Sequence, residues 1–144
     1  MDNCIFCKIA AGKIPSNTVY EDEDFRVILD LNQGMKGHML ILPKEHYENF
    51  YELPDELAAK AMILAKKLSL AARKAFEKAG TPLDGLNILQ NNGEAAGQSV
   101  MHYHLHVLPR IKGDDPLFPL WSEAAMESGD MKALAESLKG ALES

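Results

Sequence analysis

The sequence has little cysteine, no long apolar run and no excess of positive charge, and each shortage excludes a class of protein. Two cysteines in 144 residues are too few for the disulfide framework of a small secreted domain. The unbroken apolar runs are only a few residues long, far short of the roughly 20 residues of a membrane-spanning helix. With 15 Lys and Arg against 21 Asp and Glu, the formal net charge is −6, which argues against nucleic acid or an anionic membrane as a partner.

The chain has the composition of one folded domain. Hydrophobic residues make up 47% of it and charged residues 25%, which is too apolar a mixture for a disordered chain. The residues after Met1 lack the basic and apolar segments of a secretory signal, so we expect a cytoplasmic protein. In that reducing setting two cysteines are more often thiols or metal ligands than a disulfide.

Short strand-like segments and one long helical pattern predict an α+β fold. Residues 54–79 repeat apolar side chains in steps of three and four, the pattern of one long helix, and Pro54 and Gly80 suit its two ends. The strand-like segments are residues 18–22, 25–30, 37–42, 86–91 and 100–108. In this order they predict a five-stranded, largely antiparallel sheet accompanied by the long helix and a C-terminal helix.

A change of composition after Lys112 divides the chain into a domain of residues 1–112 and a C-terminal extension of residues 113–144. In the extension, Asp130 is expected to cap an amphipathic helix that packs on the domain. The apolar side chains of this helix are Met131, Leu134, Leu138 and Leu142. Trp121, the single tryptophan, is a candidate packing anchor for it.

The most informative segment is a row of alternating histidines, His102, His104 and His106. Residues two apart on a strand share a face, so the three imidazoles are predicted to lie on one side of the strand. A purely structural row is disfavoured because every buried imidazole needs polar partners. One metal ion bound by all three is also disfavoured, because the outer Cα atoms would lie about 13 Å apart. The row therefore favours catalysis in which neighbouring histidines have different tasks.

Histidine suits attack on phosphorus. A neutral imidazole is available at pH 7, and it leaves again from a phosphoramidate, which splits one displacement into two. A second histidine two residues along can give a proton to the leaving group. The loop at residues 91–99 has two glycines that let backbone N–H groups approach phosphate oxygens. By itself this loop would be an ordinary hairpin connection, but beside the histidines we interpret it as a phosphate loop.

Cys4 and Cys7 have the C-x-x-C spacing of a metal-binding knuckle. A redox pair would need a thioredoxin-like context that this N-terminal segment lacks, and two incidental thiols are the remaining alternative. A tetrahedral site needs two further ligands, for which His38, His46 and the histidine row are the candidates.

The residues from His102 to Leu108, preceded by Gly97–Val100, resemble the histidine triad (HIT) superfamily of nucleotide hydrolases and transferases, and its Hint branch in particular. The likeness includes Gly37–Lys44 and Asp30–Asn32 and covers about residues 4–112. It implies a HIT-like fold. It also implies hydrolysis of nucleoside phosphoramidates, or related adducts of a purine nucleoside monophosphate such as AMP, through a covalent nucleotidyl-histidine.

The resemblance implies a role for each matching residue. His104 would be the nucleophile, His106 the proton donor or phosphate ligand, and His38 a member of their hydrogen-bond network. The implied substrate-binding residues are Asp30 for the ribose, Asn91 and Ser99 for the phosphate, and Leu31, Phe6 and Ile28 for the base.

The resemblance also implies a zinc ion and a homodimer. In bacterial HIT proteins and related galactose-1-phosphate uridylyltransferases, zinc is held by positions that correspond to Cys4, Cys7, His46 and His102. Four protein ligands leave no open position, so one structural zinc per subunit and no catalytic metal are expected. Homodimers of this family are joined through the long helix and the following strand. Met62, Ile63 and Leu70, which lie off the main helical stripe, are then a second packing face and not ordinary surface residues.

Two other functions stay open. Pro109–Arg110 and Lys112–Asp114 look closer to diadenosine polyphosphate hydrolases of the Fhit type. A nucleotide-binding regulatory or scaffold protein with little turnover is the alternative from another class, and the intact triad counts against it. The extension around Trp121 either packs on its own domain or reaches the partner's active site, as the chain after the triad can do in this family.

Overall fold

The structure is a computed structural model that describes residues 3–31, 33, 35–114 and 127–143. Its elements in chain order are α1 (Ile5–Ala10), β1 (Thr18–Glu21), β2 (Phe25–Leu29), β3 (Met39–Pro43), α2 (Asp55–Lys78), β4 (Gly85–Leu89), the 3-10 turn η1 (Glu94–Ala96), β5 (Leu105–Arg110) and α3 (Ser128–Glu143). Among these described residues, no helix combines the length and the apolar character that a membrane crossing requires.

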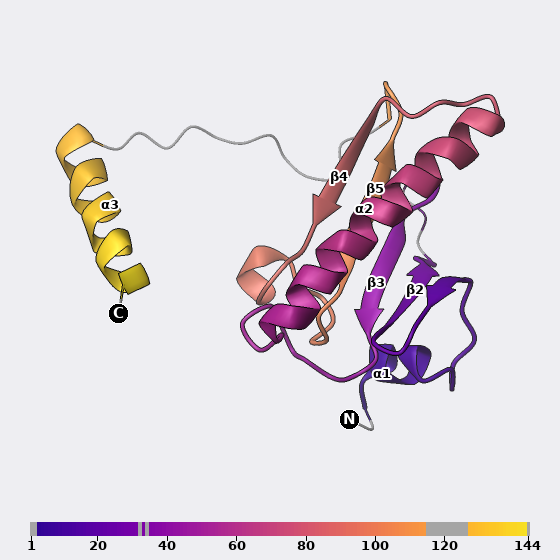
Figure 1. Cartoon of the computed structure of the whole chain (residues 1–144), viewed down its shortest axis with the longest axis horizontal. Helices are drawn as coiled ribbons and strands as arrows, with labels where there is room; N and C mark the ends of the chain where they lie inside the picture. Colours follow the sequence, from indigo (N-terminus) through magenta and orange to yellow (C-terminus); the bar gives the residue numbers. More distant parts are fainter. Residues whose placement is uncertain (1–2, 32, 34, 115–126, 144) are drawn as a thin grey trace.

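The five strands form one antiparallel sheet in the order β1-β2-β3-β5-β4. The chain leaves the sheet after β3, runs through α2, returns as the edge strand β4 and then inserts β5 between β3 and β4. Figure 1 shows α2 lying along one face of the sheet. The predicted α+β class and the five-stranded antiparallel sheet are confirmed.

The main core lies between α2 and the sheet. Ala61, Leu64 and Leu68 of α2 are buried against strand residues such as Val27 and Val107, as the periodicity of residues 54–79 predicts. Pro54 occupies the N-cap position of α2. Gly80 follows the C-cap with a φ of 83°, the left-handed conformation that glycine adopts without strain.

A smaller core lies on the opposite face of the sheet, under α1. Its buried members are Ile9, Ile28, Leu40 and Leu42, with Phe6 and Ile14 packed against them. Leu40 is directly opposite His106 in the pairing of β3 with β5, and opposite residues of an antiparallel pair share a face. His106 therefore lies on the α1 face of the sheet, away from α2.

The strand at residues 100–108 is shorter at its start than predicted, because β5 begins only at Leu105. The residues before it are held by polar contacts outside the ladder. The N–H of Tyr103 donates to the carbonyl of Tyr47 at 2.6 Å, and a ring nitrogen of His102 bonds to the carbonyl of Pro43 at 2.9 Å. At its other end β5 continues through Pro109 to Arg110, because both residues still pair with β4.

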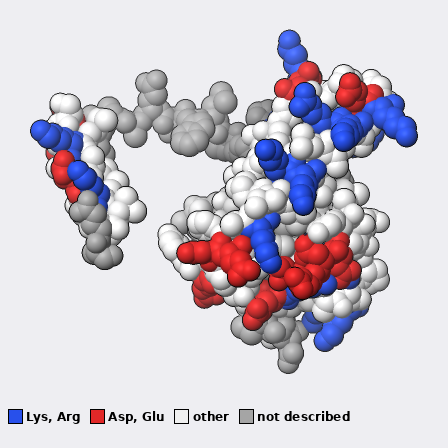
Figure 2. All heavy atoms as spheres, viewed as in Figure 1, with Lys and Arg blue, Asp and Glu red and all other residues white. Residues whose placement is uncertain are grey.

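Charge is unevenly distributed over the face that carries α2. Figure 2 shows Lys and Arg gathered over the C-terminal half of α2, and Asp and Glu around its N-terminal end. Asp55 and Glu56 lie in the first turn and Lys78 in the last, the arrangement that the helix dipole favours. This surface belongs to the face opposite His106, so it does not provide the charge for a phosphate site.

The C-terminal helix forms as predicted, but it does not pack as predicted within the single chain. It begins at Ser128, which places Asp130 in its first turn and not at the cap. Its apolar residues are exposed, and Figure 1 shows α3 lying apart from the sheet and α2. The division of the chain at residue 112 stays a prediction, and Trp121 lies outside the described residues.

Candidate functional site: a histidine pair beside a Cys-His cluster

The predicted histidine row is divided between two sites that lie side by side. Only His106 belongs to β5, while His102 and His104 occupy the irregular segment before the strand. His102 turns towards the cysteines of α1, whereas the rings of His104 and His106 lie 4.9 Å apart between centroids. The row thus supplies one residue to a metal-type cluster and two to a second site.

His104 is buried and held in one orientation. The residue is 6% exposed, and its Nδ1 bonds to the carbonyl oxygen of His102 at 2.7 Å. A carbonyl can only accept, so Nδ1 carries the hydrogen and Nε2 keeps its lone pair. Burial lowers the pKa of His104 below the ordinary histidine value, so the imidazole is neutral at pH 7. This is the form in which histidine can act as a nucleophile.

His106, His38 and Asp30 form a chain of polar groups next to His104. Nδ1 of His106 lies 2.9 Å from Nε2 of His38, and Nδ1 of His38 lies 3.6 Å from a carboxylate oxygen of Asp30. The carboxylate favours a proton on Nδ1 of His38, so Nε2 of His38 accepts the hydrogen bond from His106. Burial lowers the pKa of His38 and brings that of His106 to about 4.

The three residues predicted for the base pocket have different surroundings. Phe6 packs edge-on against His104, with ring centroids 5.0 Å apart. Ile28 is buried in the small core that Phe6 covers, and Leu31 is 86% exposed. Phe6 is therefore in direct contact with a histidine of the site.

The loop before the histidines is shaped by a residue that the sequence interpretation did not single out. Gln98 is 3% exposed, and its amide donates to the carbonyl oxygens of Glu48 and Val100. Its side-chain oxygen accepts from the N–H of Gly93 at 2.7 Å. The only sequence signal was one amide residue between the glycine and the serine of the loop. The predicted phosphate ligands Asn91 and Ser99 lie on this loop and are at least partly exposed.

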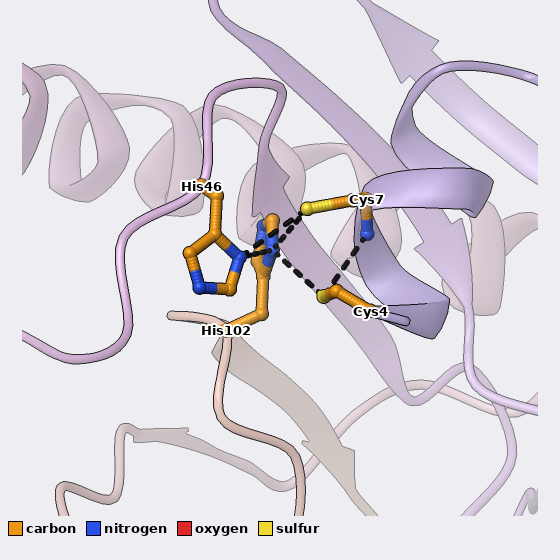
Figure 3. A group of neighbouring side chains, drawn as sticks. All are labelled: Cys4, Cys7, His46 and His102. Carbon is orange, nitrogen blue, oxygen red and sulfur yellow. Dashed lines mark hydrogen bonds between the residues drawn. The ribbon is translucent and has the colours of Figure 1, made fainter. Parts of the chain in front are cut away.

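Cys4, Cys7, His46 and His102 form a compact cluster, shown in Figure 3. Their ligand atoms all lie within 4.8 Å of one another. Nδ1 of His102 lies 3.4 Å from each of the two sulfurs and 3.2 Å from Nδ1 of His46. Nδ1 of His46 lies 3.3 Å from the sulfur of Cys7. Cys4 is the N-cap of α1 and Cys7 lies within this helix. His46 comes from the loop after β3 and His102 from the segment before β5, so only the fold brings the four residues together.

The cluster has the geometry and chemistry of a metal site. Ligand atoms around one tetrahedral zinc ion lie about 3.3 to 3.8 Å apart, close to the 3.2 to 3.4 Å separations that the histidine nitrogens make here. Burial lowers the pKa of His102 to about 4, which keeps the ring neutral, and neutral imidazole is the ligand form. The other nitrogen of His102 bonds to the carbonyl of Pro43, the outer contact that metal-binding histidines usually make. These four residues could hold a metal ion.

A family comparison agrees with this arrangement. Residues 11–113 match the HIT domain model. The chain belongs to the HIT family. The HIT protein of Bacillus subtilis (strain 168), named Protein hit, is 51% identical over 124 residues, covering 86% of this chain and 82% of that protein.

Two further relatives of this HIT chain have named activities. The adenosine 5'-monophosphoramidase HNT1 of Saccharomyces cerevisiae is 35% identical over 140 residues. The match covers 97% of this chain and 83% of that protein. The adenylylsulfatase HINT3 of Arabidopsis thaliana is 36% identical, with 91% of this chain and 62% of that protein covered.

Solved structures share the fold over almost the whole HIT chain. A HIT family protein of Bacillus subtilis superposes with a TM-score of 0.85 at 46% identity and 96% coverage of each chain. One from Bacillus anthracis gives 0.87 at 36% identity and 97% coverage of each. A zinc-bound histidine triad family protein of Mycobacterium smegmatis gives 0.68 at 36% identity, covering 97% of this chain and 98% of that one.

Proposed function

We propose that this HIT protein is a hydrolase of nucleoside phosphoramidates or related adducts of a purine nucleoside monophosphate, AMP foremost. The observation that carries the proposal is the state of His104: buried, neutral, bonded through Nδ1 to the carbonyl of His102 and therefore nucleophilic at Nε2. The named activities of HNT1 and HINT3 support the same chemistry. We also propose a cytoplasmic location.

In the first step Nε2 of His104 attacks the α-phosphorus, and the bond from phosphorus to the leaving amine breaks. The departing nitrogen needs a proton, for which His106 is the nearest donor, since its ring lies beside that of His104. His106 is neutral in the free protein, but the negative charge of a bound phosphate raises the pKa of a neighbouring imidazole. Binding of the substrate thus supplies the acid that the leaving group needs.

In the second step water attacks the same phosphorus and passes a proton to His106, which the first step left neutral; the bond from phosphorus to His104 breaks and releases the nucleoside monophosphate and the free imidazole. His38 and Asp30 hold the ring of His106 through the polar chain described above. The Asp30 side chain is 26% exposed, so its carboxylate can also accept hydrogen bonds from ribose hydroxyls. Asn91 and Ser99 bind the phosphate, and Phe6, Leu31 and Ile28 form the base pocket.

We propose that Cys4, Cys7, His46 and His102 hold one structural zinc ion per subunit. Their separations and the neutral state of His102 support this choice. A bound zinc ion would link α1 to the segment before β5, and with four protein ligands it would have no open position for catalysis. His102 is also the residue whose carbonyl orients His104, so the cluster holds the nucleophile in place without entering the reaction.

We further propose that the protein is a homodimer joined through α2 and β4, without a nucleic acid or membrane partner. Met62, Ile63 and Leu70 of α2 are 48 to 59% exposed, and β4 is an edge strand whose Leu86 is also exposed. Exposed apolar residues beside an open strand edge favour pairing with a second copy.

The features that resemble the Fhit type have a structural explanation. The guanidinium of Arg110 donates to the carboxylate of Asp114 at 2.7 and 2.9 Å and to the side chain of Asn87 at 2.8 Å. Arg110 therefore anchors the end of β5 and does not identify a second nucleotide site.

The proposed function is tested by comparing the turnover of adenosine 5'-phosphoramidate and of diadenosine polyphosphates by the wild-type protein. Faster turnover of the phosphoramidate, with a mass increase of one nucleotidyl group on His104 in rapidly quenched samples, is expected. A preference for the dinucleotide would favour the Fhit-type activity, and no turnover of either would favour a binding or scaffold protein.

A further inference from the structure

Gln98 is a buried residue whose side-chain polar atoms are all bonded to backbone groups. Its Nε2 donates to the carbonyl oxygens of Glu48 at 2.6 Å and Val100 at 3.0 Å. An amide side chain has two N–H donors, so both are engaged. Its Oε1 accepts from the N–H of Gly93 at 2.7 Å. A substrate could accept from the amide only after one of these bonds broke, so the geometry favours a supporting role over direct contact.

The same residue closes the loop that precedes the histidines. The backbone N–H of Gln98 donates to the carbonyl of Gly93 at 3.0 Å, while the N–H of Gly93 donates to the Gln98 side chain. Between the two residues lies the 3-10 turn η1, and residues 93–97 are exposed. A short 3-10 turn has poor internal hydrogen-bond geometry, so the paired bonds between Gly93 and Gln98 hold the loop in shape.

The residues proposed to bind the phosphate flank this closed loop. Asn91 lies two positions before Gly93, and Ser99 directly follows Gln98. The amide of Asn91 also donates to the carbonyl of Gly97 at 3.5 Å. The separation of Asn91 and Ser99 therefore depends on the closure of the loop by Gln98.

A second support comes from the segment that supplies His46 to the Cys-His cluster. Glu48, whose carbonyl accepts the bond from Gln98, lies two residues after His46. The N–H of Phe50 donates to the side-chain oxygen of Asn92 at 2.7 Å. The segment of residues 46–50 thus bonds to the loop near both of its ends, and it begins at a member of the cluster.

We propose that Gln98 is a positioning residue for the phosphate of the substrate. It holds the loop of residues 91–99 against the segment of residues 46–50, and so keeps Asn91 and Ser99 at the separation that a phosphate group requires. The inference rests on the proposed function and deepens it, because it names what keeps the phosphate ligands in place. Gln98 acts through these two residues and does not itself bond to the substrate.

Ligand binding to a Gln98→Met variant tests this role. Methionine is of similar length and unbranched, so it fills the space of the glutamine without its N–H donors. In calorimetry the affinity for AMP is expected to fall about tenfold or more, while the affinity for adenosine, which has no phosphate, stays within about twofold of wild type. Equal losses for the two ligands, or an unchanged affinity for AMP, would overturn the proposal.

A Leu68→Val variant controls for a loss of stability alone. Leu68 is buried in the core between α2 and the sheet, so the shorter side chain lowers the unfolding temperature without touching the loop. This variant is expected to bind AMP and adenosine as the wild type does. A loss of AMP affinity as large as that of Gln98→Met would show that the effect follows stability and not the shape of the loop.

An Asn92→Ala variant separates positioning from direct contact with the substrate. It removes the bond from Phe50 and leaves Gln98 in place. The affinity for AMP is expected to fall about threefold or more, with little change for adenosine, because one support of the loop is lost. Normal AMP affinity in this variant, beside a loss in Gln98→Met, would assign Gln98 a direct contact and overturn the positioning role.

Turnover of adenosine 5'-phosphoramidate by the wild-type protein is measured in parallel. An active enzyme whose Gln98→Met variant loses affinity for AMP and adenosine alike refutes only the positioning role. A wild-type protein without turnover, whose Gln98→Met variant still shows the selective loss of AMP binding, refutes only the proposed function.

Discussion

The Nδ1 atom of His104 lies 2.7 Å from the carbonyl oxygen of His102, and this one hydrogen bond joins the two sites of the protein. The side chain of His102 belongs to the Cys-His cluster, while its backbone carbonyl selects the tautomer of His104. A change in the cluster that moves residue 102 therefore also moves the proposed nucleophile.

Replacement of the nucleophile tests its role directly. His104→Ala is expected to lower kcat for adenosine 5'-phosphoramidate by about 10³-fold or more, because the proposed mechanism passes the nucleotidyl group through this residue. AMP affinity and metal content are expected to stay close to wild type, as measured by calorimetry and elemental analysis. Substantial turnover by a correctly folded His104→Ala protein would contradict covalent catalysis at this residue.

Loss of one thiolate is expected to remove the metal and to destabilise the protein. Cys4→Ser should purify with far less than one zinc per chain and unfold at a temperature lower by roughly 5 to 15 °C, since metal binding contributes to the free energy of folding. Asn3→Ser, at the exposed neighbouring position, is the matched control. Wild-type protein that purifies without zinc, together with a Cys4→Ser protein that unfolds at the wild-type temperature, would show that the cluster holds no structural metal.

The carboxylate of Asp30 is expected to distinguish ribose from deoxyribose. Asp30→Asn should lower kcat/KM for the ribonucleotide substrate by about 10- to 100-fold, because a charged acceptor for the hydroxyls is lost. The same variant should lose most of the preference of the wild-type protein for ribo- over 2'-deoxyribo-substrate. An unchanged preference would assign Asp30 to the orientation of His38 alone.

Acid is expected to destabilise the fold through the histidines of the site. Burial brings the pKa of His106 to about 4, below the value of about 6.5 in an unfolded chain. The unfolded state therefore binds more protons than the native state in this range, and stability is lost as the pH falls from about 6.5 towards 4. For His106 the loss between pH 7 and pH 5 is about 2 kcal/mol.

Urea unfolding at the two pH values measures this effect. His106→Gln, which keeps a polar side chain but does not titrate, should lose less stability than the wild-type protein over the same interval. Because both proteins retain the Cys-His cluster, its own pH dependence cancels in the comparison. Equal losses in the two proteins would show that the pKa of His106 is not lowered in the native state.

Several features of the fold follow from local patterns in the sequence. The steps of three and four over residues 54–79 place Leu64 and Leu68 on one side of a helix, and burial against a sheet follows. The spacing of Cys4 and Cys7 brings both sulfurs to one end of α1 within a single turn. Such predictions succeed because they depend on backbone geometry over a few residues.

The start of β5 could not be predicted in the same way. Alternation favoured a strand from residue 100, but Tyr103 donates to Tyr47 and His102 bonds to Pro43, and both partners are distant in the sequence. The role of Gln98 could not be predicted either, because its amide bonds to the carbonyl of Glu48, which is also distant in the sequence. The exposure of α3 in the single chain could not be predicted either, because an amphipathic pattern does not indicate which surface will cover the apolar face of a helix.

The sequence by itself determined which residues are the candidates for the chemistry: three alternating histidines, a C-x-x-C pair and two further histidines at positions 38 and 46. The tertiary structure decided how they are divided. The pairing of β3 with β5 brings His38 to His106, while the loop after β3 brings His46 to His102 and the cysteines. Sequence spacing is read along one backbone, whereas a ligand set and a tautomer depend on atoms from separate segments, which only the folded chain brings within hydrogen-bonding distance.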